Sequence, residues 1–372
     1  MKKYLLIVSV LFLISCQKTK NEEPKGIKIG DPETTSIKGF YLLNEGSFGG
    51  NNASLDYYNY QNGYYQKDIY LTSNPNVVMD LGDVGTDLKI YGSKLYAAIN
   101  SSNKIEVMKK ENAQRIAQVN IANVRYITFD GGYMYATSYA GPIDLDTNQA
   151  QRGYVAKIDT STFQIIDTVV VGYQPEEMAV LNGKLYVANS GGYLVHKYER
   201  TVSVIDLSSF QVTGEIDVAV NLHRIRADKR GNLWVSSRGD YFSIPSRLYR
   251  IYNNVLAQMI DVPVSDLCVV GDSIYITGVQ WSNETGSNTI SYALVSANEG
   301  SVLDNSLIKD GTNIIAPYGI AVNPVTKDFY ITDAKDYSLQ GEIYCFGANG
   351  YKKWQLTVGK LPATFAFVRT NF

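Results

Sequence analysis

The sequence predicts an all-β fold, a seven-bladed β-propeller with four-stranded antiparallel blades, from three observations. A short strand-like segment centred on an aromatic residue recurs seven times along the chain. A pattern typical of the innermost strand of a blade recurs at the end of the chain. No segment shows sustained helical periodicity. Repeats of this length and composition are typical of propeller blades.

The repeated segment begins with a turn of Gly, Asn, Asp or Lys, followed by an apolar residue, an aromatic residue and small residues. Leu185–Asn189 (Leu-Tyr-Val-Ala-Asn) is a representative copy. The aromatic positions step by 55, 39, 51, 48, 41 and 55 residues, and they are Tyr41, Tyr96, Tyr135, Tyr186, Trp234, Tyr275 and Tyr330. We expect these side chains to pack between neighbouring blades, with hydroxyls reaching blade edges.

The other strands of a unit can be read around the copy at Leu185. An inner strand is predicted over Gly172–Leu181, followed by a hairpin turn at Asn182–Lys184. The third strand is predicted over Thr201–Asp206 and the fourth over Gly214–Val218.

The two ends of the chain predict how the ring closes. Pro362–Val368 repeats the inner-strand pattern of Pro175–Leu181, and Pro317–Val322 shows it again. Nothing similar precedes Phe40, so the first unit lacks an inner strand that the last residues can supply. The C-terminal strand should therefore complete the first blade and remove an open sheet edge. A sandwich or a solenoid does not explain this arrangement.

Composition excludes several classes of protein. The chain has 372 residues, is 45% hydrophobic and carries a formal charge of −2, with two His and three Cys. Such a chain buries a large core, so neither disorder nor a disulfide-stapled scaffold is expected. The balanced charge argues against nucleic-acid binding, and the shortage of His argues against a metal centre. We expect no catalytic residues, no metal and no cofactor.

The N-terminal residues predict export and attachment to a membrane by a lipid. Met1–Lys3 is basic and Tyr4–Ile14 is an apolar run of 11 residues, which suits a signal peptide and is too short to span a membrane. Leu13–Cys16 resembles the lipobox of bacterial lipoproteins, so Cys16 is the expected lipidation site, with an ordinary secretory signal as the alternative. The predicted organisation is a signal peptide over 1–15, a lipidated cysteine and flexible tether over 16–37, and the propeller over 38–372. Cys268 and Cys345 are expected to be buried free thiols.

Propeller ligands usually bind at one face, formed by the loops that enter the inner strands and those that join second to third strands. Here the second-to-third loops are long and aromatic, over residues 44–52, 138–152, 189–200, 238–247, 278–288 and 333–340. Exposed aromatics are costly unless they contact something, although some should fold down over blade tips. The candidate ligand-binding residues are Arg125, Tyr139, Asn189, Tyr193, His196, Tyr198, His223, Arg224, Arg238, Tyr241, Phe242, Trp281, Tyr318 and Tyr337.

Motifs for chemistry are scarce. Asp144–Asn148 is similar to the opening of a calcium-binding loop, but Gln149 stands where that loop needs Gly and Val155 where it needs Glu. A solvated polar loop is the favoured interpretation.

Over residues 38–372 the chain resembles the YncE-like seven-bladed propellers, on Asn182–Asn189 (Asn-Gly-Lys-Leu-Tyr-Val-Ala-Asn) and Thr201–Asp206. The lipobox, the Phe40–Gly46 opening and the closing strand at Pro362 make it similar to the BtuG surface lipoproteins of gut Bacteroidetes. That resemblance implies a binder at the outer membrane, held there by its lipid alone. It would capture cobalamin (vitamin B12), as a ligand rather than a cofactor, and deliver it to a TonB-dependent outer-membrane transporter.

In such a protein the corrin ring would lie over the central funnel, with aromatics such as Tyr139, Tyr241 and Trp281 against its apolar edges. Ligation of cobalt by His196 or His223 stays open. Three other functions remain as alternatives: a surface glycan-binding propeller, a lactonase-like hydrolase, and a scaffold for protein partners. Aromatic platforms stack sugars equally well, whereas the lack of a recognisable metal cluster weighs against the hydrolase.

Overall fold

The computed structural model describes residues 26–33, 35–77, 80–143, 148–282 and 286–370. The expected signal peptide, the lipobox with Cys16 and residues 144–147 of the polar loop lie outside this part of the chain. Across the described ranges, no helix has the length and apolar character needed to cross a membrane.

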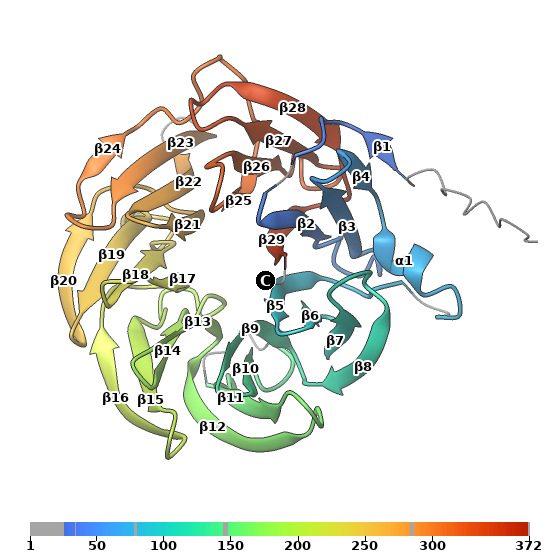
Figure 1. Cartoon of the computed structure of the whole chain (residues 1–372). Helices are drawn as coiled ribbons and strands as arrows, with labels where there is room; N and C mark the ends of the chain where they lie inside the picture. The colour runs from blue at the N-terminus through green and yellow to red at the C-terminus, as the bar shows by residue number, and fades with distance from the viewer. Residues whose placement is uncertain (1–25, 34, 78–79, 144–147, 283–285, 371–372) are drawn as a thin grey trace, which may run out of the picture.

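Seven antiparallel sheets are arranged around a central axis as the blades of a propeller, which confirms the predicted fold (Figure 1). The inner strands are β29 (Pro362–Arg369), β5 (Gly85–Tyr91), β9 (Val124–Asp130), β13 (Pro175–Leu181), β17 (Leu222–Ala227), β21 (Asp266–Val270) and β25 (Pro317–Val322). The second strands are β2 (Ile37–Asn44), β6 (Lys94–Ile99), β10 (Tyr133–Ser138), β14 (Lys184–Asn189), β18 (Asn232–Ser237), β22 (Ser273–Ser282) and β26 (Phe329–Asp333).

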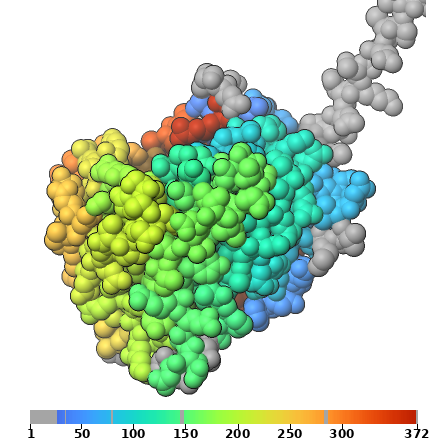
Figure 2. Space-filling view, turned by 90° about the horizontal axis from the view of Figure 1, so that it is seen from below, coloured from blue at the N-terminus to red at the C-terminus, as the bar shows by residue number. Residues whose placement is uncertain are grey.

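Outside these lie the third strands, β3 (Ser54–Asn59), β7 (Lys104–Lys109), β11 (Arg152–Asp159), β15 (Thr201–Asp206), β19 (Arg247–Tyr252), β23 (Ser287–Ser296) and β27 (Glu342–Phe346). The fourth strands are β4 (Tyr64–Gln66), β8 (Arg115–Asn120), β12 (Ile165–Tyr173), β16 (Gln211–Asp217), β20 (Val255–Ile260), β24 (Val302–Asp304) and β28 (Lys352–Thr357). In side view, the green residues of blades 3 and 4 lie between blade 2 (cyan) and blade 5 (yellow) (Figure 2).

The C-terminal strand closes the ring as predicted. β29 pairs antiparallel with β2, with Phe367 opposite Phe40 and Phe365 opposite Leu42. Blade 1 therefore takes its inner strand from the end of the chain and its other strands from the beginning. This pairing leaves no open edge at the seam of the ring.

The segment before β2 corrects the expectation of a flexible tether up to residue 37. Ile27–Lys28 forms β1, which pairs with Tyr64 and Tyr65 of β4 as a fifth strand of blade 1. The backbone N–H of Ile29 also donates to the carbonyl of Gly63 at 2.9 Å. β4 is only 3 residues long and would otherwise leave its outer edge unpaired, so this segment covers it.

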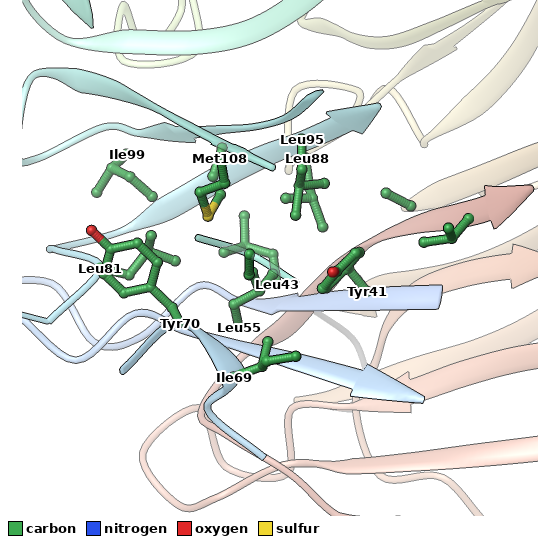
Figure 3. Close-up of a cluster of buried hydrophobic side chains, with 14 residues drawn as sticks. Tyr41, Leu43, Leu55, Ile69, Tyr70, Leu81, Leu88, Leu95, Ile99 and Met108 are labelled. Atoms are coloured by element: carbon green, nitrogen blue, oxygen red, sulfur yellow. The ribbon is translucent and has the colours of Figure 1, made fainter. Parts of the chain in front are cut away.

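Apolar side chains fill the space between neighbouring blades. Figure 3 shows one such cluster, in which Tyr41, Leu43 and Leu55 of blade 1 meet Leu88, Leu95, Ile99 and Met108 of blade 2. Ile69 and Tyr70 of the short helix α1 (Ile69–Ser73) pack into the same cluster. Burial of this kind is the main favourable contribution to the stability of the ring.

The repeated aromatics lie between blades, as predicted. The hydroxyl of Tyr41 donates to the carbonyl of Lys110 in blade 2 at 2.9 Å, and that of Tyr186 donates to Asn254 Oδ1 in blade 5 at 2.7 Å. Six of the seven are buried, and Tyr275 is half-buried. Trp234 differs in its hydrogen bond, because its Nε1 donates to Asp228 Oδ2 within the same blade.

Buried carboxylates join the inner strands of neighbouring blades. In three blades an acidic residue near the start of the inner strand accepts the backbone N–H of the next inner strand, at 2.9 to 3.1 Å: Asp87 from Ile127, Glu177 from Ile225, and Asp266 from Ile320. Each is compensated by a cation of the channel wall, in the pairs Asp87 with Lys89, Glu177 with Arg226, and Asp266 with Arg224. These charges hold the inner strands in register around the central channel.

Candidate functional site

A cavity of about 390 Å³ lies at the centre of the face formed by the loops that enter the inner strands and the loops that join second to third strands, here called the loop face. The first residues of several inner strands and the ends of second-to-third loops line it. Its charged and aromatic lining residues are Glu45, Arg125, Tyr126, His223, Arg224, Arg238, Tyr241, Tyr318 and Tyr337.

The structure brings half of the predicted site residues to this one cavity, namely Arg125, His223, Arg224, Arg238, Tyr241, Tyr318 and Tyr337. An adjoining cavity of about 400 Å³ shares Arg238 and Tyr241 with it and adds Phe242 and Trp281. Nine of the fourteen candidates therefore line two neighbouring cavities over blades 5, 6 and 7 and the central axis.

Three further candidates come from the loop between β14 and β15 and lie beside these cavities. His196 stacks on Phe242 with ring centroids 5.2 Å apart, and Tyr198 meets Tyr241 edge-on at 6.5 Å. Tyr193 is 44% exposed, like Tyr241 at 54%, Phe242 at 63%, Trp281 at 51% and Tyr337 at 48%. We call Tyr193, His196, Tyr198, Tyr241, Phe242, Trp281 and Tyr337 the aromatic rim.

Two predicted ligand-contact residues, Asn189 and Tyr139, have buried side chains that hydrogen-bond inside the ring. Asn189 is fully buried, and its Nδ2 donates to Thr201 Oγ1 at 3.1 Å and to Ser203 Oγ at 2.9 Å. Tyr139 is 5% exposed, and its hydroxyl donates to Glu176 Oε1 at 2.9 Å. An amide or phenol inside a protein is usually committed to such internal bonds.

The segment 278–288, expected as a loop, is mostly strand. β22 and β23 are each 10 residues long and pair out to Ser282 and Ser287, with Trp281 opposite Asn288. Trp281 therefore stands on an extended hairpin of blade 6 that forms one wall of the adjoining cavity. A strand holds this side chain in place more firmly than a loop would.

Glu176 organises the cations of the central cavity. Its carboxylate accepts from Arg238 Nη1 at 3.0 Å and from Arg125 Nη2 at 3.3 Å, and the carboxylate is 2% exposed. Burial alone would raise the pKa of Glu176, but the charges of Arg125 and Arg238 and the bonds from Arg238 and Tyr139 outweigh it and lower this pKa to about 2. The carboxylate is therefore ionised throughout the physiological pH range.

Burial acts on two further titratable side chains of the cavity, His223 and Glu45. Burial, followed by the positive charges of Arg238, Arg224 and Arg125, lowers the pKa of His223 well below its usual range, so the imidazole is neutral at pH 7. Its Nε2 bonds the hydroxyl of Tyr126 at 2.9 Å.

Burial raises the pKa of Glu45, opposed by a hydrogen bond from the Tyr318 hydroxyl and by the charges of Arg125 and Arg224. Both side chains line the cavity, and burial disfavours the charged form of each.

A second cavity of about 570 Å³ occupies the channel on the opposite side of the Arg224–Asp266 pair. Lys89, Arg226 and Cys268 are among its lining residues. Cys345 is a buried free thiol as expected, whereas Cys268 is only half-buried on this wall. In the described part of the chain, no group of three or more His, Cys, Asp or Glu side chains is placed to hold a metal ion.

The sequence over residues 38–367 matches the family described as a domain of unknown function, DUF5074. The chain belongs to this family. No curated protein matches it significantly. The match spans the whole propeller from β2 to β29, so the family is defined by the ring rather than by the N-terminal segment.

Solved structures similar to this DUF5074 propeller share its fold at low sequence identity. A quinonprotein alcohol dehydrogenase-like protein from Bacteroides thetaiotaomicron is 14% identical, with a TM-score of 0.64 over 90% of this chain and 79% of that one. A functionally unknown protein from Desulfotomaculum acetoxidans is 11% identical, with a TM-score of 0.62 over 90% and 100%. Hydrazine synthase from Kuenenia stuttgartiensis is 16% identical, with a TM-score of 0.57 over 71% and 77%. These likenesses show the fold alone.

Sequence reasoning missed the acidic partners of the DUF5074 site. The cations of the central cavity are positioned by the carboxylates of Glu45, Glu176 and Asp266. The ring of Tyr126 lies against two of these cations, Arg125 and Arg224. One signal was available, since Glu176 and Glu177 stand at the second and third positions of the predicted inner strand that begins with Pro175. What the pattern alone does not show is which blade supplies the partner across the axis.

Proposed function

We propose that this protein captures cobalamin on its loop face and passes it to a TonB-dependent outer-membrane transporter, acting by binding rather than by catalysis. The observation that carries the proposal is the aromatic rim beside a polar central cavity. Rim side chains that are about half exposed bring apolar surface to water, which is costly unless a ligand covers them. The choice of cobalamin follows the resemblance to the BtuG surface lipoproteins.

The chemistry of the face suits a large, flat ligand with polar edges. A corrin ring offers an apolar face to aromatics such as Tyr241 and Trp281, and its peripheral amide carbonyls accept from guanidinium and hydroxyl donors. A rigid propeller loses little conformational entropy on binding, which favours tight capture.

We further propose that cobalt is bound without a histidine ligand. His223 is neutral, the form that ligates metals, but its Nε2 is already bonded to Tyr126. His196 lies on the rim against Phe242. The visible spectrum of aquocobalamin should therefore keep its band positions on binding, and a shift like that given by free imidazole would overturn this part.

The test is co-elution of purified protein with cyanocobalamin in gel filtration, followed by the visible absorbance of the ligand. The wild type should carry cobalamin at micromolar concentration. The double variant Tyr241→Ala/Trp281→Ala should bind at least about tenfold more weakly, because stacked aromatics dominate such contacts. Tyr351→Ala is the matched control, since this tyrosine is 56% exposed but stands in the turn between β27 and β28, on the opposite face.

Absence of co-elution for the wild type would overturn cobalamin capture. Binding to a glycan array, with loss in the same double variant, would then favour the sugar-binding alternative that the exposed aromatics also support. Hydrolysis of a lactone substrate would overturn the proposal of a non-catalytic binder. Co-purification with a detergent-solubilised TonB-dependent cobalamin transporter from the same organism tests delivery.

The anchoring proposal is separate, because it concerns residues outside the described part of the chain. We propose that Cys16 carries the lipid and holds the protein at the outer membrane, exposed at the cell surface. A Cys16→Ala variant should lose incorporation of labelled palmitate and appear in the soluble fraction. Unchanged membrane fractionation would overturn this proposal.

A further inference from the structure

Three guanidiniums form the floor of the central cavity of the loop face. Arg125 and Arg224 stand near the starts of β9 and β17, and Arg238 follows the end of β18. All three line the cavity, whereas their carboxylate partners Glu176 and Asp266 do not and are buried at 2% and 6% exposure. The cavity surface therefore presents Glu45 and the three guanidiniums, with the carboxylates of Glu176 and Asp266 behind them. We call Arg125, Arg224 and Arg238 the guanidinium floor.

The charges of this floor do not balance. Glu176 is shared between Arg125 and Arg238, and Asp266 pairs with Arg224 at 2.9 Å. Three guanidiniums thus share two buried carboxylates. The acid that lines the cavity is Glu45, whose carboxyl accepts the Tyr318 hydroxyl and whose pKa is raised by burial, which disfavours its ionised form. An anion that enters the cavity would offset an excess positive charge in a site partly shielded from water.

The guanidiniums also have donors to spare. A guanidinium carries five N–H groups, and Glu176 engages Nη2 of Arg125 and Nη1 of Arg238. Arg125 Nε is buried and has no hydrogen-bond partner within the described ranges. A planar fork of this kind matches the paired oxygens of a carboxylate or a phosphate.

Aromatic rings hold the forks in place before a ligand arrives. The guanidinium of Arg125 lies 5.0 Å from the ring centroid of Tyr139 and 5.7 Å from that of Tyr126. The guanidinium of Arg224 lies 5.3 Å from the ring centroid of the same Tyr126. Tyr139 is itself bonded to Glu176, so the floor is one connected and preorganised unit.

We propose that the guanidinium floor is a subsite for one oxyanion of the ligand, a phosphodiester or a carboxylate. The inference deepens the proposed function, on which its cobalamin arm rests, because cobalamin carries a single phosphodiester in its nucleotide loop. The subsite itself is argued from charge and donors alone and does not depend on the corrin ring. It assigns the floor to the anion and the aromatic rim to the remainder of the ligand.

The first experiment compares cyanocobalamin with dicyanocobinamide, which lacks the nucleotide loop and its phosphodiester, by isothermal titration. The wild type should bind cobalamin at least about tenfold more tightly than cobinamide, and Arg238→Gln should reduce that ratio severalfold. Arg247→Gln is the matched control, because Arg247 is similarly exposed, at 26% against 24% for Arg238, pairs with the exposed Asp261 and lines neither cavity.

The second experiment needs no cobalamin. Millimolar dimethyl phosphate or acetate should raise the Tm of the wild type and of Arg247→Gln but not that of Arg238→Gln, and the stronger of the two identifies the preferred oxyanion. If Arg238→Gln does not fold, two measurements on the wild type still test the subsite: the ratio of cobalamin to cobinamide affinity and the effect of the anions on the Tm.

Equal binding of cobalamin and cobinamide, with no anion effect on Tm, would overturn the subsite while leaving cobalamin capture intact. Anion stabilisation without any cobalamin binding would instead support the subsite and overturn the proposed function.

Discussion

Replacing Glu176 by glutamine should reduce the stability of the propeller by about 3 kcal/mol at pH 7. Glutamine has nearly the shape of the protonated carboxyl, so the variant keeps the volume of the side chain, removes its charge and replaces one acceptor oxygen by an NH2 donor. Arg125 and Arg238 would then share a neutral amide instead of a carboxylate. Leaving partly buried cations without their buried counter-ion is a costly change in a protein.

The magnitude follows from the pKa of Glu176. Its fold-dependent depression, from 4.5 to about 2, corresponds to about 3 kcal/mol at roughly 1.4 kcal/mol for each pKa unit. A carboxyl whose pKa is lower in the folded state contributes stability above its unfolded pKa, and that contribution is lost as the pH falls. Wild type and variant should therefore differ fully at pH 7, progressively less below pH 4.5, and little near pH 2.

Urea unfolding followed by tryptophan fluorescence, at several values of pH, measures the difference. Glu215→Gln is the control, because Glu215 is 45% exposed and lies 3.7 Å from the half-exposed Arg152. A surface pair of this kind contributes at most about 1 kcal/mol. A Glu176→Gln effect no larger than the control, or one that stays constant down to pH 2, would refute the reasoning.

Three further predictions concern the ring, the cavity and the channel wall. A chain ending at Leu361 lacks β29 and should lose cooperative thermal unfolding, because β2 then has no inner strand to pair with. Removal of residues 1–25 is the control and should leave the Tm unchanged. A folded monomer of normal Tm without β29 would contradict closure by the C-terminal strand. Because burial raises the pKa of Glu45, dimethyl phosphate should bind more weakly as the pH rises above 4.5, and Glu45→Gln should flatten that profile in titration calorimetry. Burial raises the pKa of the Cys268 thiol to about 11. In a Cys16→Ser background, Cys268 of the folded protein should therefore react with a disulfide reagent at pH 8 on the order of a hundredfold more slowly than in urea. A fast stoichiometric phase in the folded protein would contradict the raised pKa.

The fold was predictable because each blade repeats the same local problem. A turn, an apolar residue and a buried aromatic recur in every unit, and Tyr41, Tyr186 and Trp234 are buried for the same reason wherever they occur. The closing strand was predictable because an incomplete first unit and a surplus inner strand at Pro362 match each other. The fifth strand at Ile27–Lys28 was not, because two residues carry no periodicity.

The site was predictable only in outline. Loop composition identified the face, and Arg125, Arg224 and Arg238 do meet at its centre. Loop composition also pointed to Asn189, whose side chain hydrogen-bonds within blade 4. In the sequence, an asparagine at the end of a strand gives the same signal whether its amide faces a ligand or its own blade.

The sequence by itself determined the seven blades, their order and the closure of the ring, because these follow from local periodicity and from pairing between segments of recognisable pattern. Only the tertiary structure decided which charges meet. Glu176 is 51 residues from Arg125 and 62 residues from Arg238 in the sequence. The three side chains meet because closing the ring brings the starts of β9 and β13 and the end of β18 to one axis. Electrostatic partnership across that axis depends on distances of a few ångströms, which no spacing along the chain encodes.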